Sequence, residues 1–466
     1  MSHLITEWDP ENEVFWRERG KRIARRNLVW SILAENLGFS VWFVWSVTAK
    51  RLNDAGFHFG KDQLYLLVAI PGLVGATMRL PYTFAVPKFG GRNWTVVSAL
   101  LLFIPTVLLA VLVQRPDTPF WVMALAAATA GLGGGNFASS MANISFFYPD
   151  REKGFALGLN AAGGNIGVSM VQLIIPFLVG PGVIAAAIGG RHTPAGIYLQ
   201  NAGLFWIPFI AVAVVGAFLF MNNLATARSS FRDQIKVTGN KHTWIMSWLY
   251  LGCFGSFAGY SAAFPLLLQE FPKTSLELAF LGPLVGAIAR PFGGYIADRF
   301  SGARVTFWNF VAMASATAGV LYFVTTKSFG GFLTMFMLLF MITGIGNGST
   351  FKMIPVLFRR QHVDPKSSPA AQAAAMIVAR REGAAVIGLA SAFGALGAFF
   401  IPGSFSASIK ATGGPLTALS WFLVFYLSCI GLTWWCYLRT GLGSTAAPAP
   451  AGAGTVSPEA EEAVPS

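Results

Sequence analysis

The 466-residue sequence predicts an all-α membrane protein in which twelve transmembrane helices form two pseudo-symmetric six-helix halves. Three observations support this fold class. Hydrophobic residues make up 54% of the chain and charged residues only 11%, whereas soluble domains contain roughly 25% charged residues. The chain contains twelve apolar runs long enough to cross a bilayer core of about 30 Å. Motifs of the first six runs also recur in the last six.

The apolar runs are separated by loops, and the loop after the sixth run is a polar stretch that divides the runs six and six. The first six runs cover residues 28–48, 63–86, 94–113, 119–147, 155–179 and 200–222. The last six cover residues 243–268, 276–297, 304–325, 331–357, 376–400 and 415–438. Each run is expected to form one helix, because about 20 apolar residues in a helix span the hydrocarbon core.

The polar break divides the chain into two predicted bundles. The expected parts are an N-terminal segment 1–27, a first bundle 28–222, a linker 223–242, a second bundle 243–440 and a tail 441–466. The tail is rich in Ala, Pro, Gly and Ser, and we expect it to be disordered because it can bury little apolar surface. The charged segment before Leu28 lacks an apolar core, so the first helix is expected to remain a membrane span.

Positive charges are distributed unequally between the two sets of predicted loops. The net charge is +13, and with a cytoplasmic N-terminus 22 of the 33 Lys and Arg residues fall on the cytoplasmic side, against 8 on the other. The positive-inside rule then predicts that both termini are cytoplasmic. Topology therefore accounts for the basic charge, and no nucleic-acid partner is expected.

Residues that commonly hold metals or haem are few and poorly placed for that role. Cys253, Cys429 and Cys436 lie in apolar runs without the spacing of a zinc site or a disulfide pair. The five histidines lie outside the predicted spans or at their margins. We therefore expect no cofactor, no metal site and no enzymatic activity.

Two motifs recur at nearly the same spacing in the two halves. The stretches RLPYTFAVPKFGGR (79–92) and RPFGGYIADRFSGAR (290–304) begin 211 residues apart, each with an arginine inside a span. The stretches GLGGGN, from Gly131, and GIGNGS, from Gly344, begin 213 residues apart. The matching offsets favour a duplicated six-helix unit, as in transporters whose site lies between two repeats.

Arg79 and Arg290 are charged residues within predicted spans, where an arginine costs at least about 2.5 kcal/mol on insertion scales. Arginine cannot avoid this cost by losing its proton, so something must compensate each charge. One interpretation pairs each arginine with a carboxylate on a neighbouring helix. The candidate carboxylates are Glu35, well inside a span, and Asp62, Glu277, Asp298 and Glu382, near span ends. The other interpretation is that both arginines share an anion, for which the planar guanidinium offers parallel donors.

The apolar segments 131–149 and 156–167 are unusually rich in glycine and asparagine. Glycines allow helix backbones to approach closely, so these segments are predicted to be helix-contact faces. Asn160 and Asn165 either bridge helices or donate amide hydrogens to a small oxyanion, and both interpretations remain open. A phosphate-binding loop is disfavoured, because no strand precedes GLGGGN and no Gly-Lys-Ser follows it.

Three segments resemble the nitrate/nitrite porter family of the major facilitator superfamily. They are GGGNFASSMANISFFYP (133–149), GFALGLNAAGGNIGVSM (154–170) and GLASAFGALGAFFIP (388–402), and the resemblance extends to residues 5–28 and 244–257. It implies the major facilitator fold and a nitrate/nitrite transporter that works by alternating access. It also implies a multi-pass protein of the bacterial inner membrane that functions as a monomer. Nitrate/nitrite antiport is favoured, with nitrate/proton symport and a non-transporting nitrate sensor as alternatives.

The resemblance also implies roles for particular residues. Arg79 and Arg290 would clamp nitrate. The other implied contacts are Asn165 and Tyr250, with Phe137 and Phe254 as aromatic walls of the site. The stretch GGYIADRFSGAR (293–304) resembles the superfamily's gating loop. Its members Asp298, Arg299 and Arg304 would latch helices together on the cytoplasmic side.

Glu35 in the first span and Lys352 in the tenth depart from the family pattern. A carboxyl group at membrane depth could carry a proton, which is the basis of the symport alternative. Equally, the two charges could neutralise one another if their helices meet, or either could lie near the cytoplasmic mouth. These interpretations leave the mode of energetic coupling open.

Overall fold

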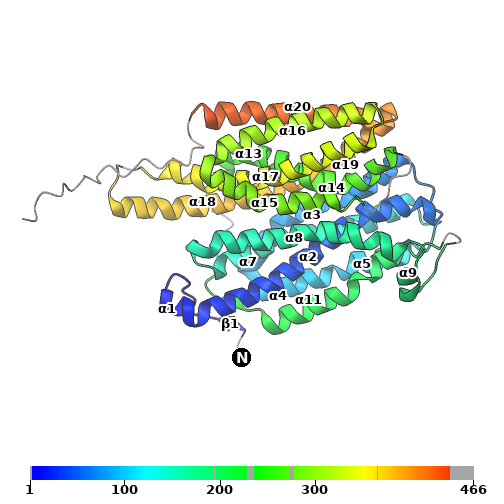
Figure 1. The fold of residues 1–466 in the computed structure, drawn as a ribbon. Helices are drawn as coiled ribbons and strands as arrows, with labels where there is room; N and C mark the ends of the chain where they lie inside the picture. The colour runs from blue at the N-terminus through cyan, green and yellow to red at the C-terminus, as the bar shows by residue number, and fades with distance from the viewer. Residues whose placement is uncertain (1–2, 194–195, 228–235, 272–277, 365, 441–466) are drawn as a thin grey trace, which may run out of the picture.

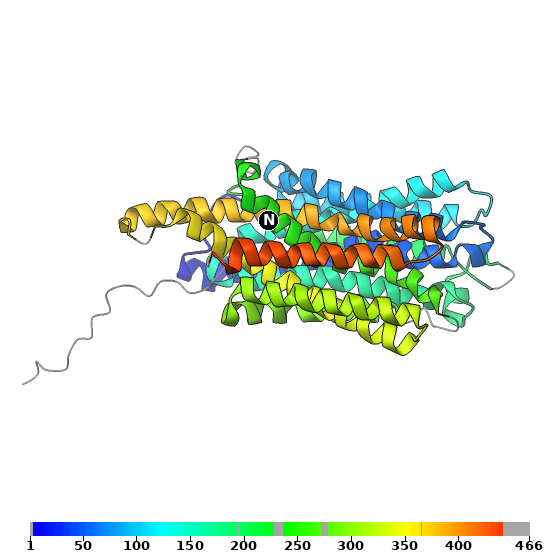
Figure 2. The same cartoon turned by 90° about the horizontal axis from the view of Figure 1, so that it is seen from above.

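The computed structural model describes residues 3–193, 196–227, 236–271, 278–364 and 366–440. Long helices run side by side along one direction (Figures 1 and 2). In Figure 1 most helices of the first half, blue to green, lie below those of the second half, green to red. Glu277 and the predicted tail 441–466 lie outside the described residues, as does part of the predicted linker.

The first half consists of long helices, with short elements before, between and after them. The short elements are β1 (Leu4–Ile5), α1 (Glu13–Phe15), the π-turn η1 (Trp16–Gly20), η2 (Asn53–Ala55), α9 (Val183–Ile188) and β2 (Asn223–Leu224). The long helices, some built from two consecutive segments, are α2 (Lys21–Arg51), α3 (Lys61–Phe89), α4 (Gly91–Leu101) with α5 (Phe103–Leu112), α6 (Phe120–Gly134) with α7 (Asn136–Phe147), α8 (Asp150–Val179), and α10 (Asn201–Leu204) with α11 (Trp206–Phe220).

The second half repeats this plan. Its elements are η3 (Val237–Gly239), α13 (Lys241–Tyr250) continued by the π-turn η4 (Leu251–Gly255), α14 (Ser256–Leu267) and η5 (Leu268–Glu270), then α15 (Leu281–Phe300), α16 (Gly302–Thr325), α17 (Phe329–His362), α18 (Pro369–Ala395) with α19 (Gly397–Thr412), and α20 (Leu416–Thr433) with η7 (Trp434–Leu438). The first turns of α18 project from the bundle at the same end as α1 (Figures 1 and 2).

The predicted twelve-helix arrangement is confirmed. Within the described residues, eleven helices are long and apolar enough to cross a membrane. The twelfth is α15, which contains Arg290 and ends with Asp298 and Arg299, so it is less apolar than the others. Its described start at Leu281 lies later than the predicted start of the eighth span, whereas the eleventh span is longer than predicted and runs from Pro369 to Thr412.

Glycines at equivalent positions in the two halves make equivalent contacts. In the first half, Gly131 of α6 packs against the backbone of Gly75 on α3. In the second half, Gly344 of α17 packs against the backbone of Gly286 on α15. Neither Gly131 nor Gly344 leaves room for a Cβ atom, because the facing helix fills the space. The repeated sequence motifs therefore correspond to one repeated helix–helix contact.

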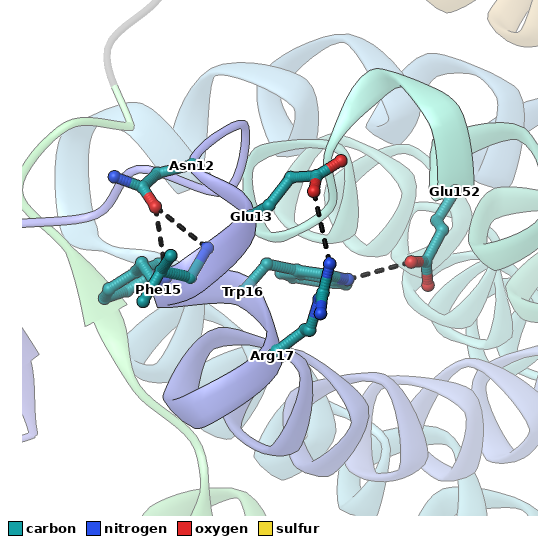
Figure 3. Close-up of polar contacts among 7 residues, drawn as sticks. Asn12, Glu13, Phe15, Trp16, Arg17 and Glu152 are labelled. Atoms are coloured by element: carbon teal, nitrogen blue, oxygen red, sulfur yellow. Dashed lines mark hydrogen bonds and ion pairs between the residues drawn. The ribbon is translucent and has the colours of Figure 1, made fainter.

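The N-terminal segment folds back onto one end of the first half. Strand β1 pairs in parallel with β2, which follows α11. Asn12 caps α1, and the indole N–H of Trp16 donates to a carboxylate oxygen of Glu152 at the start of α8, at 2.8 Å (Figure 3). Arg17 and Glu13 form an exposed ion pair on the same turn (Figure 3). The segment therefore joins the start of α8 to the end of α11.

The two halves are joined at the opposite end. Lys61 at the start of α3 forms an ion pair with Glu270 of η5, with an N–O distance of 3.2 Å. The Ser406 hydroxyl on α19 donates to the backbone carbonyl of Asp62 at 2.8 Å. Gly72 of α3 packs against the backbone of Ala398 on α19. These contacts close the bundle at the end that carries Lys61.

The close glycine contact gives a first prediction. We expect Gly344→Ala to lower stability by about 1–3 kcal/mol, because the added methyl group forces α17 away from α15. The matched control is Gly431→Ala on α20, where a Cβ atom meets open space and loss of glycine's flexibility favours the helix. Thermal unfolding of the detergent-solubilised variants measures both effects. Equal unfolding temperatures for the two variants would show that the α15–α17 contact is not tight.

Candidate anion-binding site

The two predicted intramembrane arginines converge on one aromatic ring. Arg79 lies on α3 and is fully buried, and Arg290 lies on α15 with 8% of its surface exposed. Their guanidinium carbons lie 4.6 Å and 5.9 Å, respectively, from the ring centroid of Phe137 on α7. The structure therefore brings together one permanent cation from each half.

Arg79 has hydrogen-bond partners but, among the residues that the structure describes, no carboxylate in salt-bridge contact. Its Nη1 donates to the backbone oxygen of Ser391 at 2.9 Å and to the hydroxyl of the same residue at 2.6 Å. Its Nε donates to the backbone oxygen of Gly134 at 3.2 Å. Its Nη2 is buried and has no partner. Because Ser391 lies on α18, this contact also crosses between the halves.

Arg290, like Arg79, has a hydrogen-bonded nitrogen and a buried nitrogen without a partner. Its Nη2 donates to the hydroxyl of Tyr250 at 3.3 Å, and its Nη1 is buried without a partner. Among the described residues, neither Arg290 nor Arg79 forms a salt bridge with a carboxylate. The interpretation in which each arginine has its own carboxylate therefore fails, and each keeps one unused donor group.

Aromatic rings enclose the two arginines. Phe137 and Phe254 stack with centroids 6.1 Å apart, and Tyr250 stacks on Phe254 at 5.4 Å with nearly parallel planes. The guanidinium carbon of Arg79 also lies 4.9 Å from the Phe254 centroid. Tyr250 immediately precedes the π-turn η4, and Phe254 lies within it. Such π-turns are frequent at functional sites, and this one places both rings toward the arginines.

Asn165 and Asn347 are buried amides that the folded chain does not satisfy. Each is 1% exposed, and in each case both the amide nitrogen and the amide oxygen lack a partner. Asn165 was among the predicted site residues, and Asn347 was not. On α17, Asn347 lies one turn before Phe351, whose ring is 5.3 Å from the guanidinium carbon of Arg290 and packs edge-on against Tyr250.

Four functional candidates were missed from the sequence. They are Asn347, Ser391, Trp42 and Phe351, of which the last two also contact the arginines. Asn347 had a usable signal, because it lies in the repeated GIGNGS motif. Ser391 lies in the segment 388–402 that resembles the porter family, but nothing in that segment distinguishes it, and Phe351 lacked any signal, since a lone phenylalanine in an apolar helix is ordinary. Only the tertiary contact with an arginine distinguishes them.

Other asparagines of the glycine-rich segments bridge helices. The Asn160 amide on α8 donates to Glu35 on α2 and to the Ser140 hydroxyl on α7, the latter at 2.8 Å. The Asn136 amide donates to the backbone oxygen of Ala34 on α2 at 3.4 Å. Asn160 therefore bridges helices, which was one of the two interpretations of these amides. Asn165 has no hydrogen-bond partner among the described residues.

The suggested pairing of Glu35 with Lys352 is wrong. Glu35 faces α7 and α8 inside the first half, where Ser140 and Asn160 donate to it. Lys352 belongs to the second half and instead forms an ion pair with Asp298 at 2.9 Å, with both side chains about half exposed. The lysine reaches the solvated end of α15 because its long side chain can carry the ammonium group out of the apolar region.

Of the gating-loop residues, Asp298 joins two helices through an ion pair. Within the described residues, Asp298 has Lys352 of α17 as its salt-bridge partner rather than Arg299 or Arg304. The guanidinium of Arg299 lies over the ring of Tyr295 at 4.5 Å. Arg304 lies in the first turn of α16. In this conformation the acidic residue therefore joins α15 to α17 within the second half.

The fold and the site together define a multi-pass membrane transporter with two related halves and a buried pair of cations between them. Residues 28–402 match the Major Facilitator Superfamily. The chain is 46% identical over 448 residues to the nitrate/nitrite transporter NarU of Salmonella typhimurium, covering 94% of this chain and 96% of that protein. It is 37% identical to the probable nitrate/nitrite antiporter NarK2 of Thermus thermophilus, covering 94% and 97%.

Solved structures agree with this fold. A bacterial homologue of the human lysosomal transporter Spinster, in an inward-facing and occupied conformation, matches with a TM-score of 0.64 and 16% identity over 91% of this chain and 98% of that one. The chain belongs to the Major Facilitator Superfamily and, within it, to the porter family that includes the NarU proteins. The predicted fold class and family resemblance are therefore confirmed, and the chain is a transporter.

Proposed function

We propose that this protein exchanges nitrate for nitrite across the bacterial inner membrane by alternating access. The observation that carries the proposal is the convergence of Arg79 and Arg290 on the ring of Phe137. Both arginines are buried, and neither has a carboxylate partner among the described residues. Relatives that are named nitrate/nitrite transporters and cover nearly the whole chain support the substrate. The relative named a probable antiporter supports the exchange mode.

The site has the chemistry to bind a small planar anion. Arg79 Nη2 and Arg290 Nη1 are the unused donors from the two halves, and guanidinium groups bind flat oxyanions through parallel hydrogen bonds. The unpartnered amides of Asn165 and Asn347 offer further donors. Phe137 and Phe254 would lie against the faces of the ion. A single negative charge between the arginines would offset much of their mutual repulsion.

This repulsion also explains exchange. Two cations held in a site of low dielectric repel each other strongly, so the empty carrier resists closing its halves around the site. A bound nitrate or nitrite ion reduces the repulsion and allows the halves to close. Reorientation is then fast only when the site is occupied, and the return step requires a second anion. Net uptake of one anion is coupled to release of another.

The contacts between the halves support an inward-facing orientation for this conformation. The closed end carries Lys61 and Glu270, and the positive-inside distribution puts the Lys61 loop on the outer face. The opposite end carries the N-terminal segment and the basic loops, so we place both termini in the cytoplasm. The lipid bilayer is then the partner of the outer helix surfaces, and we propose that the monomer is the functional unit, because each chain provides both halves of the site.

Exchange predicts dependence on internal anion. Purified protein in liposomes loaded with nitrite should take up nitrate rapidly, and nitrite-free liposomes should show little uptake. Strong uptake into nitrite-free liposomes under an imposed pH gradient would instead indicate proton symport. Nitrate binding without flux under either condition would indicate a sensor.

The separate hydrogen bonds of the guanidinium nitrogens predict that charge alone is insufficient. Arg79→Lys and Arg290→Lys should each reduce exchange by at least about tenfold, because one ammonium nitrogen cannot both keep the contacts that each guanidinium makes within the protein and present a further donor to the anion. The control is Arg115→Lys, an exposed arginine between α5 and α6, which should leave exchange unchanged. Counterflow assays at matched protein density compare the three variants. Full activity in either buried variant would contradict the proposed clamp.

The unpartnered amide of Asn347 gives a prediction that separates binding from folding. Asn347→Leu should weaken nitrate binding about tenfold or more, because a hydrogen bond to a charged group contributes roughly 1.5–3 kcal/mol. Its thermal stability should stay the same or rise, since the amide has no partner in the folded chain. Calorimetric nitrate titration and thermal unfolding give the two readouts. Lower stability with unchanged binding would assign Asn347 a purely structural role.

A further inference from the structure

Glu35 is a buried carboxyl group without a cation partner. It lies on α2 with no exposed surface, and among the described residues it forms no salt bridge. Its Oε2 accepts hydrogen bonds from the Ser140 hydroxyl on α7 and from the Asn160 amide on α8. Its Oε1 is buried and has no partner. An oxygen in that position is available to carry a proton.

The carboxyl group lies close to the arginine pair. Ser140 is one helical turn after Phe137, the ring that both arginines flank. On α2, Phe39 is one turn after Glu35, and its ring packs edge-on against Phe137 with centroids 6.1 Å apart. Glu35 therefore lies about one turn from the wall of the anion site, along both α2 and α7.

Few groups face this carboxyl. Ser140 on α7 and Asn160 on α8 donate to it, and the backbone of α8 approaches it at Gly164. Helix α6 presents glycines to α2 rather than an ionisable side chain. At longer range, the charged groups that act on it are the guanidinium groups of Arg79 on α3 and Arg290 on α15. Among charged groups, the carboxylate of Glu35 therefore interacts mainly with the two arginines.

We propose that Glu35 binds a proton and that this proton binding is linked to anion binding by Arg79 and Arg290. The inference rests on the proposed nitrate/nitrite transport. It adds that pH controls how tightly the arginine site binds the anion. A proton from water adds to Oε1 and converts the carboxylate to the neutral acid, with no other bond formed or broken. The Ser140 and Asn160 donors stabilise the ionised form.

Charge determines the direction of the linkage. With Glu35 ionised, the two arginines and the carboxylate sum to one positive charge, which a nitrate ion cancels. With Glu35 protonated, two positive charges face the same ion, and the ion binds more tightly. Thermodynamic reciprocity then requires that bound nitrate also favours protonation of Glu35. In exchange, nitrate and nitrite both cross with the protonated carrier, so pH controls affinity without net proton transport.

Nitrate titration at several pH values tests the linkage. Calorimetry on the purified protein should show tighter nitrate binding as the pH falls, by up to about tenfold per pH unit when one proton is linked. Glu35→Gln should bind nitrate tightly with no pH dependence, because glutamine mimics the protonated acid. Glu18→Gln, an exposed site on η1, is the matched control and should behave like the unmodified protein.

A second readout measures the proton directly. Addition of nitrate to the unmodified protein in weakly buffered solution should raise the pH, because the protein takes up protons, and Glu35→Gln should show no such change. Ser140→Ala removes a donor to the ionised form, so the pH dependence should shift to higher pH.

The possible outcomes separate the two proposals. Equal pH dependence in the unmodified protein and in Glu35→Gln, without proton uptake, would overturn the linkage while leaving the transport function intact. Absence of nitrate binding by the unmodified protein at every pH would overturn the transport function, and the linkage with it. If Glu35→Gln failed to fold, the Ser140→Ala shift would decide the question, and an unshifted profile would count against Glu35.

Discussion

The structure depends on one electrostatic constraint: two permanent cations are buried together, and within the described part of the chain neither has a carboxylate of its own. Arg79 and Arg290 cannot lose their charge, and each has one donor group without a partner in the folded chain. A soluble protein would rarely keep such a pair, because burial of an uncompensated charge is costly. The proposed function gives this cost a use, because a transported anion would supply the missing charge.

Close helix packing makes this constraint tolerable. The Gly131–Gly75 and Gly344–Gly286 contacts hold α3 and α15 against α6 and α17, so each arginine projects from a rigid helix pair. Aromatic rings rather than acidic groups then surround the guanidinium groups, and they attract cations without neutralising them. The hydrogen bonds of Arg79 to Ser391 join the two halves, and so does its contact with the ring of Phe254. Arg79 therefore contacts both halves in this conformation.

The remaining charged groups separate into two kinds. Lys352 and Asp298 are half exposed and satisfy one another, so they hold helices together at the solvated end. Glu35 is fully buried beside the site and is held by neutral donors only. In the sequence, Glu35 and Lys352 had the same appearance, because each is a charged residue inside an apolar run. Their surroundings in the fold differ: Lys352 forms a half-exposed ion pair, whereas Glu35 lies in a buried polar cluster.

The sequence by itself determined the membrane class, the helix count, the duplicated halves and the arginine pair, because hydrophobic length, motif spacing and intramembrane charge are properties of the linear chain. It also predicted Asn165, Tyr250, Phe137 and Phe254 through the family resemblance. Only the tertiary structure decided which polar groups are satisfied: Asn160 bridges helices, Asn347 has free donors, and Lys352 pairs away from Glu35. Hydrogen-bond satisfaction depends on what the neighbouring helices present. Such partners cannot be identified from the sequence around a residue, because they lie up to several hundred residues away, as Ser391 does from Arg79.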